Sequence, residues 1–334
     1  MRAWRVRELG EPGDVLALED LPVPEPGPGQ VRIRVAAAAC NFTDVLMCRG
    51  GYQMKPPLPF TPGSELAGTI DAAGEGVTDL QPGDRVLGTP AMGCGGFAEL
   101  ALASGASLYP VPATMAWPAA AALHVTYQTG HVGLHHRGAL QPGETLLVHA
   151  GAGGIGSAAI QLGLAAGARV FATAGGSEKA QVCRDLGVEL VVDYRADDFV
   201  DAVKDATGGR GANVIYDPVG GDTFDRSRRC IAFEGRILVI GFTSGRIADA
   251  PTNHALVKNY AVVGVNWGAY GMFVPGLVRA THAALVELHD AGQIAPLVSA
   301  VLPLDDLPTA LERLASRGTW GKVVVAPDPA AVAS

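Results

Sequence analysis

Apolar residues follow two different spacings along the chain, and the change occurs near residue 140. Before about residue 120, short β-type runs such as VRIRVAAAA and LAGTIDAAG are separated by turn-rich segments such as PVPEPGPGQ and VTDLQPGDRV. Apolar runs interrupted by glycine and proline at these intervals predict an antiparallel, barrel-like domain.

Beyond residue 140, β-type runs alternate with stretches of helical spacing. TLLV, ARVFATA, VELVVDY and ANVIYDPVG are separated by SAAIQLGLAAGA, SEKAQVCRDLG and DDFVDAVKDATG. This alternation predicts right-handed βαβ crossovers and a doubly wound parallel sheet. The tail mixes helices with strands and can rejoin the first domain, so we expect an α/β protein.

Composition narrows the class of protein. The 334 residues carry a formal net charge of −8 and contain no long basic run, which argues against nucleic acid as a partner. No apolar run approaches the ~20 residues that cross a bilayer, and MRAWRVRELG lacks the apolar core of a signal peptide. We therefore expect a cytoplasmic protein with no membrane partner. The five cysteines show no CxxC spacing, which favours reduced thiols over disulfides or structural zinc.

A glycine-rich turn stands where the strand TLLV gives way to a helix. Gly151, Gly153 and Gly156 form G-x-G-x-x-G, with Gly154 and Ile155 between them. The three glycines allow a tight turn, close approach of a pyrophosphate and close packing of helix on strand, while free N–H groups at the helix start bind the anion. The motif predicts a dinucleotide site, and the alternative is a simple glycine-rich turn.

The end of the next strand indicates which dinucleotide binds. An NAD site usually has an acidic residue there, whereas this chain has Ala174, Gly175 and Gly176. A hydroxyl group, two cations and a phenol follow nearby and can converge on a 2′-phosphate; these are Ser177, Lys179, Tyr194 and Arg195. We predict NADPH as the cofactor. The alternative for Lys179 and Arg195 is ordinary surface charge.

Several motifs together resemble the medium-chain dehydrogenase/reductase superfamily, specifically its zinc-free NADPH:quinone oxidoreductase, zeta-crystallin-like branch. They include CNFTDVLMCRGGY, PPLPFTPGSELAGTI, LQPGETLLVHAGAGGIG, VIYDPVGG and GKVVV, and they span nearly the whole chain. The resemblance implies a GroES-like catalytic domain of β-barrel type, residues 1–122 and 267–334, and a Rossmann NADPH-binding domain, residues 123–266.

The resemblance also implies roles for residues around the nicotinamide. Asn41, Tyr52 and Thr126 are expected near the nicotinamide and the substrate, with Tyr52 as the best donor to a developing oxyanion. Residues at two later strand ends and one near the end of the chain complete the expected cofactor site; these are Gly241, Phe242, Val265, Trp267 and Lys322. For Tyr52 the alternative is a side chain that merely lines the cleft, and for Phe242 and Trp267 it is core packing.

Two departures from zinc-dependent relatives point to chemistry without a metal. Asn41 stands where those relatives have a Cys ligand, Ser64 stands where they have His, and neither is a usual zinc ligand. A competing metal site would use the histidines of HVGLHHRG, His131, His135 and His136, for which we favour an exposed helix face.

Without a Lewis acid, the acceptor must itself attract hydride. A quinone satisfies this requirement, and so does an activated C=C bond in an enone, a 2-haloacrylate or an acryloyl or enoyl thioester. For Asp44 and Glu65 we favour salt-bridge or turn-holding roles over acid/base chemistry, and Asp217 lies at a strand end expected near the cofactor. A hypothesis of another class is a non-catalytic, NADPH-binding structural or redox-sensing protein.

The apolar strand NYAVVGVNW is expected at an edge of the parallel sheet. An exposed apolar edge strand favours aggregation unless it is covered. We therefore expect a homodimer formed through the strand from Val262 to Trp267, an arrangement that the resemblance also implies.

Overall fold

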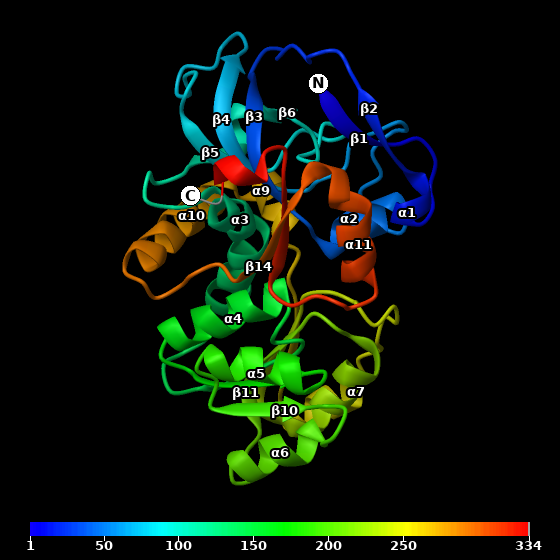
Figure 1. The fold of residues 1–334 in the computed structure, drawn as a ribbon. Helices are drawn as coiled ribbons and strands as arrows, with labels where there is room; N and C mark the ends of the chain where they lie inside the picture. Colours follow the sequence, from blue (N-terminus) through cyan, green and yellow to red (C-terminus); the bar gives the residue numbers. More distant parts are fainter. Residues whose placement is uncertain (333–334) are drawn as a thin grey trace. The chain divides into compact units, whose positions relative to one another are not determined.

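The computed structural model describes residues 1–332 and divides into two compact units. Unit 1 comprises residues 1–125 and the chain from residue 296 onward, and unit 2 comprises residues 126–295. Both units mix helices with sheet, as the sequence predicts (Figure 1). Residues 267–295, which we expected in the first domain, belong to unit 2.

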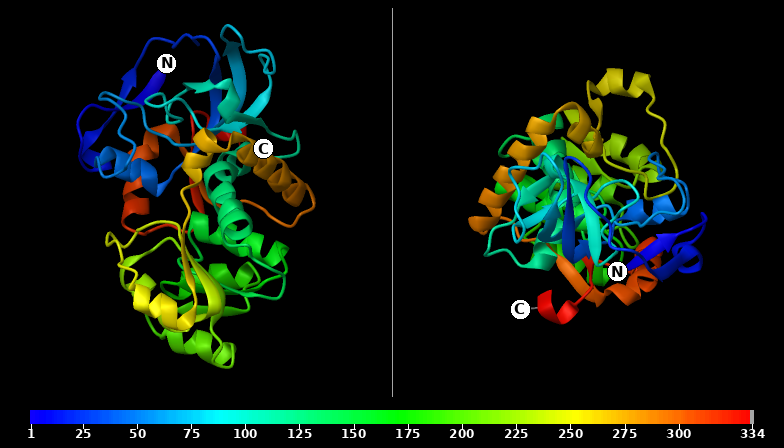
Figure 2. Two further views of the ribbon diagram at one scale, coloured as in Figure 1. Left: turned by 180° about the vertical axis from the view of Figure 1, so that it is seen from behind. Right: turned by 90° about the horizontal axis from the view of Figure 1, so that it is seen from above.

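Unit 1 is built on a seven-stranded sheet in which the first and last parts of the chain pair. The strand order is β14-β15-β3-β4-β5-β7, and β6 also pairs with β3. Every pairing except β14 with β15 is antiparallel, which confirms the predicted antiparallel domain. Figure 2 shows the blue and cyan strands together with the orange and red C-terminal segments of this unit.

The elements of unit 1 are β1 (Arg2–Val6), α1 (Pro12–Val15), β2 (Leu16–Asp20), β3 (Gln30–Ala39), α2 (Phe42–Cys48), β4 (Leu66–Ala73), β5 (Arg85–Gly88), β6 (Leu100–Ser104), η1 (Gly105–Ser107), β7 (Leu108–Pro110), β14 (Val298–Pro303), η3 (Leu304–Asp306), α11 (Leu307–Ala315), β15 (Lys322–Ala326) and α12 (Pro329–Val332).

Strand β3 shows why this sequence forms a sheet with one buried face. Val31, Ile33 and Val35 are buried in the core, while Arg32 and Arg34 on the opposite face both bind the carboxylate of Asp71. Alternate residues of a strand point to opposite faces, so the alternating pattern sets both the strand and its orientation.

Unit 2 contains a six-stranded, all-parallel sheet. Its strand order is β10-β9-β8-β11-β12-β13, in which the order reverses direction between β8 and β11. This is the predicted doubly wound Rossmann sheet, and such sheets bind ligands at the carboxyl ends of their strands beside the reversal. The strand AVVG, β13, lies at one edge as expected.

The elements of unit 2 are β8 (Thr145–Val148), α4 (Gly154–Ala165), β9 (Arg169–Ala174), α5 (Ser177–Asp185), β10 (Leu190–Asp193), α6 (Phe199–Ala206), β11 (Ala212–Asp217), α7 (Gly221–Cys230), β12 (Ile231–Val239), α8 (Thr252–Lys258), β13 (Ala261–Gly264), α9 (Trp267–Phe273) and α10 (Pro275–Asp290). Before β8, the helix α3 (Trp117–His131) spans the boundary between the units and continues as a π-helix, η2 (Val132–Arg137).

Helices cover both faces of the parallel sheet. Helices α4 and α5 lie on one side and α6 on the other (Figure 1). Phe199 and Val203 of α6 and Phe224 of α7 pack with Phe171 and Ile215 of the sheet in one buried cluster. None of the helices within residues 1–332 is long and apolar enough to cross a membrane.

Hydrogen bonds explain why the segment after α10 belongs to unit 2. The Tyr127 hydroxyl group donates to the carbonyl of Ala295 over 3.1 Å, and the Ala295 N–H donates to the Gln161 side chain over 2.6 Å. Gln161 in turn donates to the Tyr127 oxygen over 2.9 Å. Because the side chains of Tyr127 and Gln161 are buried, these bonds attach the exposed residue Ala295 to α3 and α4.

A buried histidine connects three elements of unit 2. The ring of His149 lies 3.0 Å from the Thr173 hydroxyl group of β9 and 2.8 Å from the Ser227 hydroxyl group of α7. Ser227 donates its own proton to the Thr223 carbonyl, so Nε2 of His149 carries the ring proton and Nδ1 accepts from Thr173. Burial lowers the pKa of His149 to about 4, so the ring is neutral in the folded protein.

We predict that His149→Gln reduces the loss of stability between pH 6.5 and pH 4. In this range the unfolded chain, with an ordinary histidine pKa of 6.5, binds a proton that folded His149 does not bind. The neutral ring therefore stabilises the fold fully above pH 6.5 and progressively less as the pH falls toward 4, by about 1.4 kcal/mol per pH unit. The measurement is the free energy of unfolding in urea at several pH values.

His136→Gln is the matched control because His136 is an exposed histidine of the same unit. The control should keep the pH slope of the unmodified protein. An unchanged slope in His149→Gln would contradict the assignment of a neutral, low-pKa ring.

Candidate functional site

The glycine-rich turn lies between β8 and α4 of unit 2, as predicted. A Cβ atom at Gly156 would lie 2.2 Å from the carbonyl oxygen of Ala150, and a Cβ atom at Gly151 would lie 2.9 Å from Ala172 of β9. A side chain at position 156 would displace backbone, and one at position 151 would displace packed side chains, so both glycines allow close packing. The turn between them, at Gly153, Gly154 and Ile155, is half-buried.

Helix α4 begins at Gly154 directly on this turn, three residues earlier than the helical pattern predicts. The first N–H groups of a helix have no partner within it, and the capping residue Gly153 has no side chain to supply one. The turn therefore presents N–H groups and the positive end of the helix dipole, which together suit a phosphate or pyrophosphate.

The ends of β9 and β10 lie side by side next to this turn. The N–H groups of Gly176 and Arg195 both donate to the Asp193 carboxylate, over 2.9 Å and 3.0 Å. These two N–H groups are the main reason that the pKa of Asp193 lies below its usual range. A Cβ atom at Gly175 would lie 2.3 Å from the Tyr194 hydroxyl group, so a side chain there would require the Tyr194 ring to move.

Four predicted cofactor residues belong to this edge of unit 2. Tyr194 and Arg195 follow β10, and Ser177 and Lys179 begin α5 after the end of β9. Asp193 is the residue that the sequence analysis missed, and its place directly before Tyr194 at a strand end was the available signal. Its carboxylate is bound to backbone N–H groups, so Asp193 acts as a positioning residue that holds the two strand ends together.

The predicted residues after β12 and β13 also lie at strand ends of unit 2. Gly241 and Phe242 follow β12, and the Phe242 ring contacts the position where Gly220 has no side chain. Val265 is buried and donates its N–H to Val239, and Trp267 begins α9. These residues share the carboxyl edge of the sheet.

Two further residues of unit 2 are buried. Thr126 lies buried in α3. Asp217, at the end of β11, accepts hydrogen bonds from the N–H groups of Val219 and Gly220, over 2.8 Å and 2.9 Å. Asp217 therefore holds the turn that follows its strand.

Unit 1 contains a fully buried ammonium group, that of Lys322 at the start of β15. Its Nζ atom lies 2.9 Å from the carbonyl oxygen of Cys40, 2.7 Å from Oδ1 of Asn41 and 2.8 Å from Oε1 of Glu65. An ammonium group has three N–H donors, and each of the three has an acceptor here. Lys322 is therefore saturated within unit 1, which favours a positioning role over the predicted direct contact with the cofactor.

Asn41 and Glu65 are held by the same network. The Asn41 amide donates to Glu65 over 2.9 Å and to the Ala39 carbonyl over 3.1 Å. The second oxygen of Glu65 accepts from the N–H of Val125 in α3 over 2.7 Å. Glu65 thus forms a salt bridge with Lys322 and also binds two further donors, in agreement with the structural role predicted for it.

Asp44 is a second buried carboxylate beside this network. It accepts from the Asn41 N–H over 2.8 Å and from the N–H and hydroxyl groups of Ser64 over 3.0 Å and 2.6 Å. Burial nevertheless raises its pKa to about 6. These bonds connect the start of α2 with the loop before β4, so Asp44 holds a turn as predicted.

Tyr52 lies half-buried in the loop between α2 and β4 of unit 1. Burial and the nearby charge of Asp44 both raise the pKa of its phenol. The hydroxyl group therefore keeps its proton at neutral pH and can donate a hydrogen bond.

The histidines of HVGLHHRG lie at the end of α3 and in the π-helix η2. The rings of His131 and His135 lie with centroids 4.6 Å apart at an interplanar angle of 52°, and both residues are half-buried, so the predicted exposed face holds only for His136. Burial is the main reason that the pKa of His131 falls to about 4. Within residues 1–332, no three His, Cys, Asp or Glu side chains are grouped so that they could hold a metal ion.

Comparison with known proteins identifies the family. Residues 27–113 match the alcohol dehydrogenase GroES-like domain, and residues 154–282 match the zinc-binding dehydrogenase family. A quinone oxidoreductase-like protein 2 homolog of Nematostella vectensis is 40% identical over 97% of this chain and 88% of its own length. The chain belongs to the medium-chain dehydrogenase/reductase superfamily, in its quinone oxidoreductase branch.

Solved structures of this superfamily agree over the whole chain. The Escherichia coli quinone oxidoreductase complexed with NADPH has a TM-score of 0.91 at 29% identity and covers 98% of this chain and 100% of its own. The CurK enoyl reductase has a TM-score of 0.87 at 29% identity, with 97% and 98% covered. The chain is thus similar to reductases that differ in the substrates their names indicate.

The zinc-binding description of one matched superfamily model concerns unit 2. Its match, residues 154–282, lies within unit 2 and includes neither Asn41 nor Ser64. The match therefore supports membership of the superfamily and gives no support for zinc ligands in unit 1.

We predict that Lys322→Met strongly destabilises this dehydrogenase/reductase chain. The substitution leaves the Glu65 carboxylate buried without its counter-charge, which costs about 3–5 kcal/mol. The double variant Lys322→Met/Glu65→Gln removes both charges and should recover a large part of that loss. The measurement is the free energy of unfolding in urea.

Lys55→Met is the control, because Lys55 is an exposed lysine of the same unit. It should unfold at the same urea concentration as the unmodified protein. If Lys322→Met did so too, the network around Nζ would have no role in stability.

Proposed function

We propose that the protein catalyses metal-independent transfer of a hydride from NADPH to a quinone. The observation that carries the proposal is the ammonium group of Lys322, which lies among Asn41 Oδ1, Glu65 Oε1 and the Cys40 carbonyl. A divalent cation at this position would be repelled by the ammonium group and would find Asn41 and Glu65 already bound. Neither Asn41 nor Ser64 is a usual zinc ligand.

The residues of unit 2 fit a dinucleotide with a 2′-phosphate. The N–H groups at the start of α4 would bind the pyrophosphate, and Ser177, Tyr194 and Arg195 would bind the 2′-phosphate. Strand β9 ends in Ala174 without the acidic residue that an NAD site uses, and the nearby Asp193 is bound to backbone N–H groups. The E. coli relative, whose structure is described as complexed with NADPH, supports the same cofactor.

Bound NADPH supplies a hydride from C4 of its nicotinamide, and the chain supplies surroundings for that transfer. We place Thr126, Phe242, Val265 and Trp267 beside the nicotinamide, with Gly241 leaving room for it. Asn41 would have an indirect part, because its amide group is bound within the Lys322 network.

In a site without a Lewis acid, the acceptor must accept hydride without activation by a metal ion. Reduction of a quinone places negative charge on an oxygen atom, which one hydrogen-bond donor can stabilise. We assign this role to Tyr52, whose phenol keeps its proton at neutral pH. The acidic overall charge and the apolar ring of Trp267 also suit an uncharged, flat acceptor.

An activated C=C bond is the second candidate acceptor. The similarity to the CurK enoyl reductase over nearly the whole chain favours it. Conjugation with a carbonyl group would again place the developing charge on an oxygen atom, so the same residues would serve.

The test follows oxidation of NADPH, and of NADH in parallel, in the presence of a strong chelator. We expect turnover with a quinone that resists the chelator and a higher kcat/KM for NADPH than for NADH. A preference for an enoyl thioester over the quinone would select the second candidate. Activity abolished by the chelator would contradict the metal-independent proposal, and NADPH binding without turnover of any acceptor would indicate a non-catalytic protein.

Two variants examine the roles of individual residues in the same assay. Arg195→Ala should raise KM for NADPH and leave KM for NADH unchanged, because only NADPH carries the 2′-phosphate. Tyr52→Phe should lower kcat with little change in the affinity for NADPH, because it removes a donor to the oxyanion.

We further propose that the protein forms a homodimer through the edge strand β13. Val262 of this strand is 39% exposed, and the neighbouring segments expose Leu256 at 76%, Met272 at 78% and Phe273 at 76%. Apolar side chains beside an unpaired strand edge are typical of a surface that another chain covers. A second copy paired through β13 would cover them symmetrically.

Val262→Lys should shift the protein from dimer to monomer, because a charged side chain on an edge strand opposes pairing. The molar mass in solution, from light scattering after size exclusion, measures this. Met92→Lys is the control, as Met92 is 59% exposed on unit 1. A dimer that persists in Val262→Lys would place the interface elsewhere.

A further inference from the structure

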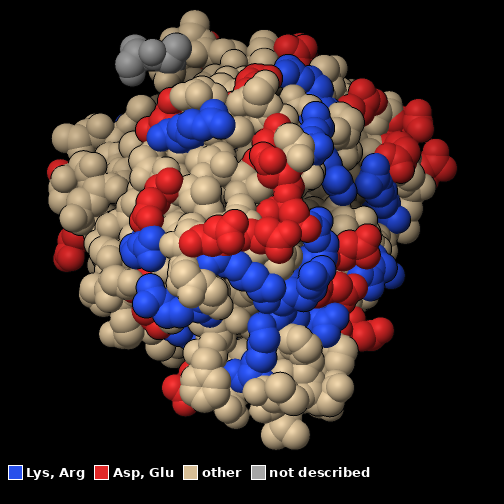
Figure 3. Space-filling view, turned by 90° about the horizontal axis from the view of Figure 1, so that it is seen from below, with Lys and Arg blue, Asp and Glu red and all other residues tan. Residues whose placement is uncertain are grey.

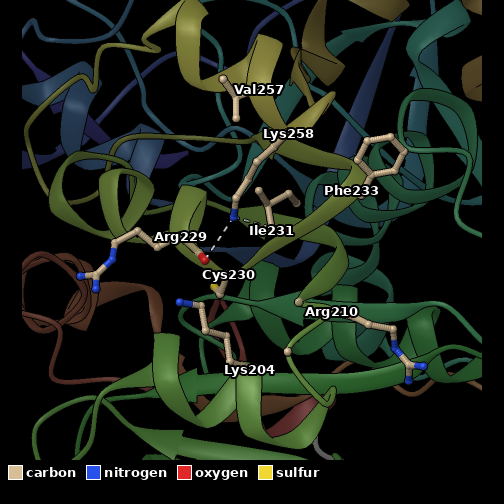
Figure 4. A pocket seen from close by; sticks show the side chains of 10 residues that line it. Lys204, Arg210, Arg229, Cys230, Ile231, Phe233, Val257 and Lys258 are labelled. Carbon is tan, nitrogen blue, oxygen red and sulfur yellow. Dashed lines mark hydrogen bonds between the residues drawn. The ribbon is translucent and has the colours of Figure 1, made fainter.

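A hollow of about 270 Å³ lies on unit 2, where α6, α7 and α8 end. Four of its lining residues are cations: Lys204, Arg210, Arg229 and Lys258. Figure 4 shows the amines of Lys204 and Lys258 near Cys230, whereas the guanidinium groups of Arg210 and Arg229 point away from them on opposite sides. No acidic residue lines the hollow within the described part of the chain.

The nearby arginines have carboxylate partners, whereas these four cations do not. Arg226 pairs with Asp198 over 2.6 Å, and Arg228 pairs with Asp225 over 3.1 Å. Among residues 1–332, no salt bridge includes any of the four cations of the hollow. The hollow therefore gathers four cations that form no salt bridge, on a protein with a net charge of −8.

The negative ends of the helix dipoles balance only part of the positive charge of these four side chains. Lys204, Arg229 and Lys258 stand in the last turns of α6, α7 and α8, where a cation stabilises the negative end of a helix. Each helix end carries about −0.5 elementary charge, so four cations at three ends leave an excess of about +2.5. Arg210 lies in the loop after α6 and stands at no helix end.

Lys258 is held in place by backbone groups. Its ammonium group donates to the carbonyl oxygens of Arg228 and Arg229, both over 3.3 Å, and to that of Ile231 over 3.5 Å, so each of its three donors has a backbone acceptor at a long distance. Burial, followed by repulsion from Lys204, lowers the pKa of Lys258. The two ammonium groups thus destabilise each other as long as no anion lies between them.

We propose that this hollow binds the phosphate groups of a small phosphorylated molecule, with Lys204 as the direct contact and the backbone-bound Lys258 as a fixed positive charge beside it. A di- or triphosphate is the class that fits, because several anionic oxygens can bind cations that approach from different elements. The site lies at the C-terminal ends of three helices and shares no residue with the glycine-rich turn.

Apolar side chains at the rim indicate the rest of the ligand. Phe233 and Val257 line the hollow and are 65% and 79% exposed. Figure 4 shows the Phe233 ring beside the hollow, across from Lys204. An exposed ring next to a phosphate site is suited to stacking a nucleobase, so the proposed ligand is a nucleoside di- or triphosphate.

The test measures binding of pyrophosphate by isothermal titration calorimetry. The glycine-rich turn is expected to bind pyrophosphate in every variant, so the hollow should appear as an additional binding event. Lys204→Glu should weaken that event by about tenfold or more, because it replaces a charge-assisted contact with a repulsive one. Arg210→Glu, on an exposed loop, should weaken it less and should fold normally.

Arg313→Glu is the matched control, since Arg313 also stands in the last turn of a helix, α11. It should retain both binding events. With ADP as the probe, Phe233→Ala should lower the affinity, whereas the affinity for pyrophosphate should not change.

The proposal would be overturned if Lys204→Glu bound pyrophosphate with the same stoichiometry and affinity as the unmodified protein. An equal loss in Arg313→Glu would also overturn it, because binding would then follow overall charge. Figure 3 shows the Lys and Arg side chains on one face of the molecule in a connected band with Asp and Glu beside it, so this control is necessary.

Discussion

Burial of the Lys322 ammonium group imposes a strict condition on unit 1. A charged group removed from water is tolerated only when every donor has an acceptor and the charge is balanced. The acceptors come from the end of β3, the start of α2 and the loop before β4, while Lys322 itself begins β15. The condition therefore joins segments from both ends of the chain, and the antiparallel pairing of β15 with β3 brings them together.

The Lys322 ammonium group is a cation that belongs to unit 1 itself and lies at the centre of this network. Glu65 balances the charge, and its second oxygen extends the network to α3 through Val125. Asn41 and Glu65 thus belong to a closed set of hydrogen bonds around an ammonium group. An acceptor that needs no Lewis acid is consistent with this arrangement, and relatives described as quinone oxidoreductases are consistent with it as well.

Local pattern was sufficient to predict most of the fold. The alternation in β3, the βα rhythm after residue 140 and the glycine-rich turn each depend on neighbouring residues, and all three are found where expected. Contacts between distant residues were not predictable in the same way. The bond of Lys322 to Asn41 spans 281 positions, and the hydrogen bonds of Asp193 and His149 depend on how strands and helices assemble.

The close approach at Gly175 couples two features of the predicted cofactor site. An NAD site uses an acidic residue after this strand, and a Cβ atom at position 175 would lie 2.3 Å from the Tyr194 hydroxyl group. Tyr194 is 47% exposed, so its ring can rotate away from such a side chain. A single substitution of Gly175 by an acidic residue would therefore add a carboxylate and also move Tyr194 from the proposed 2′-phosphate site, and both changes would disfavour NADPH.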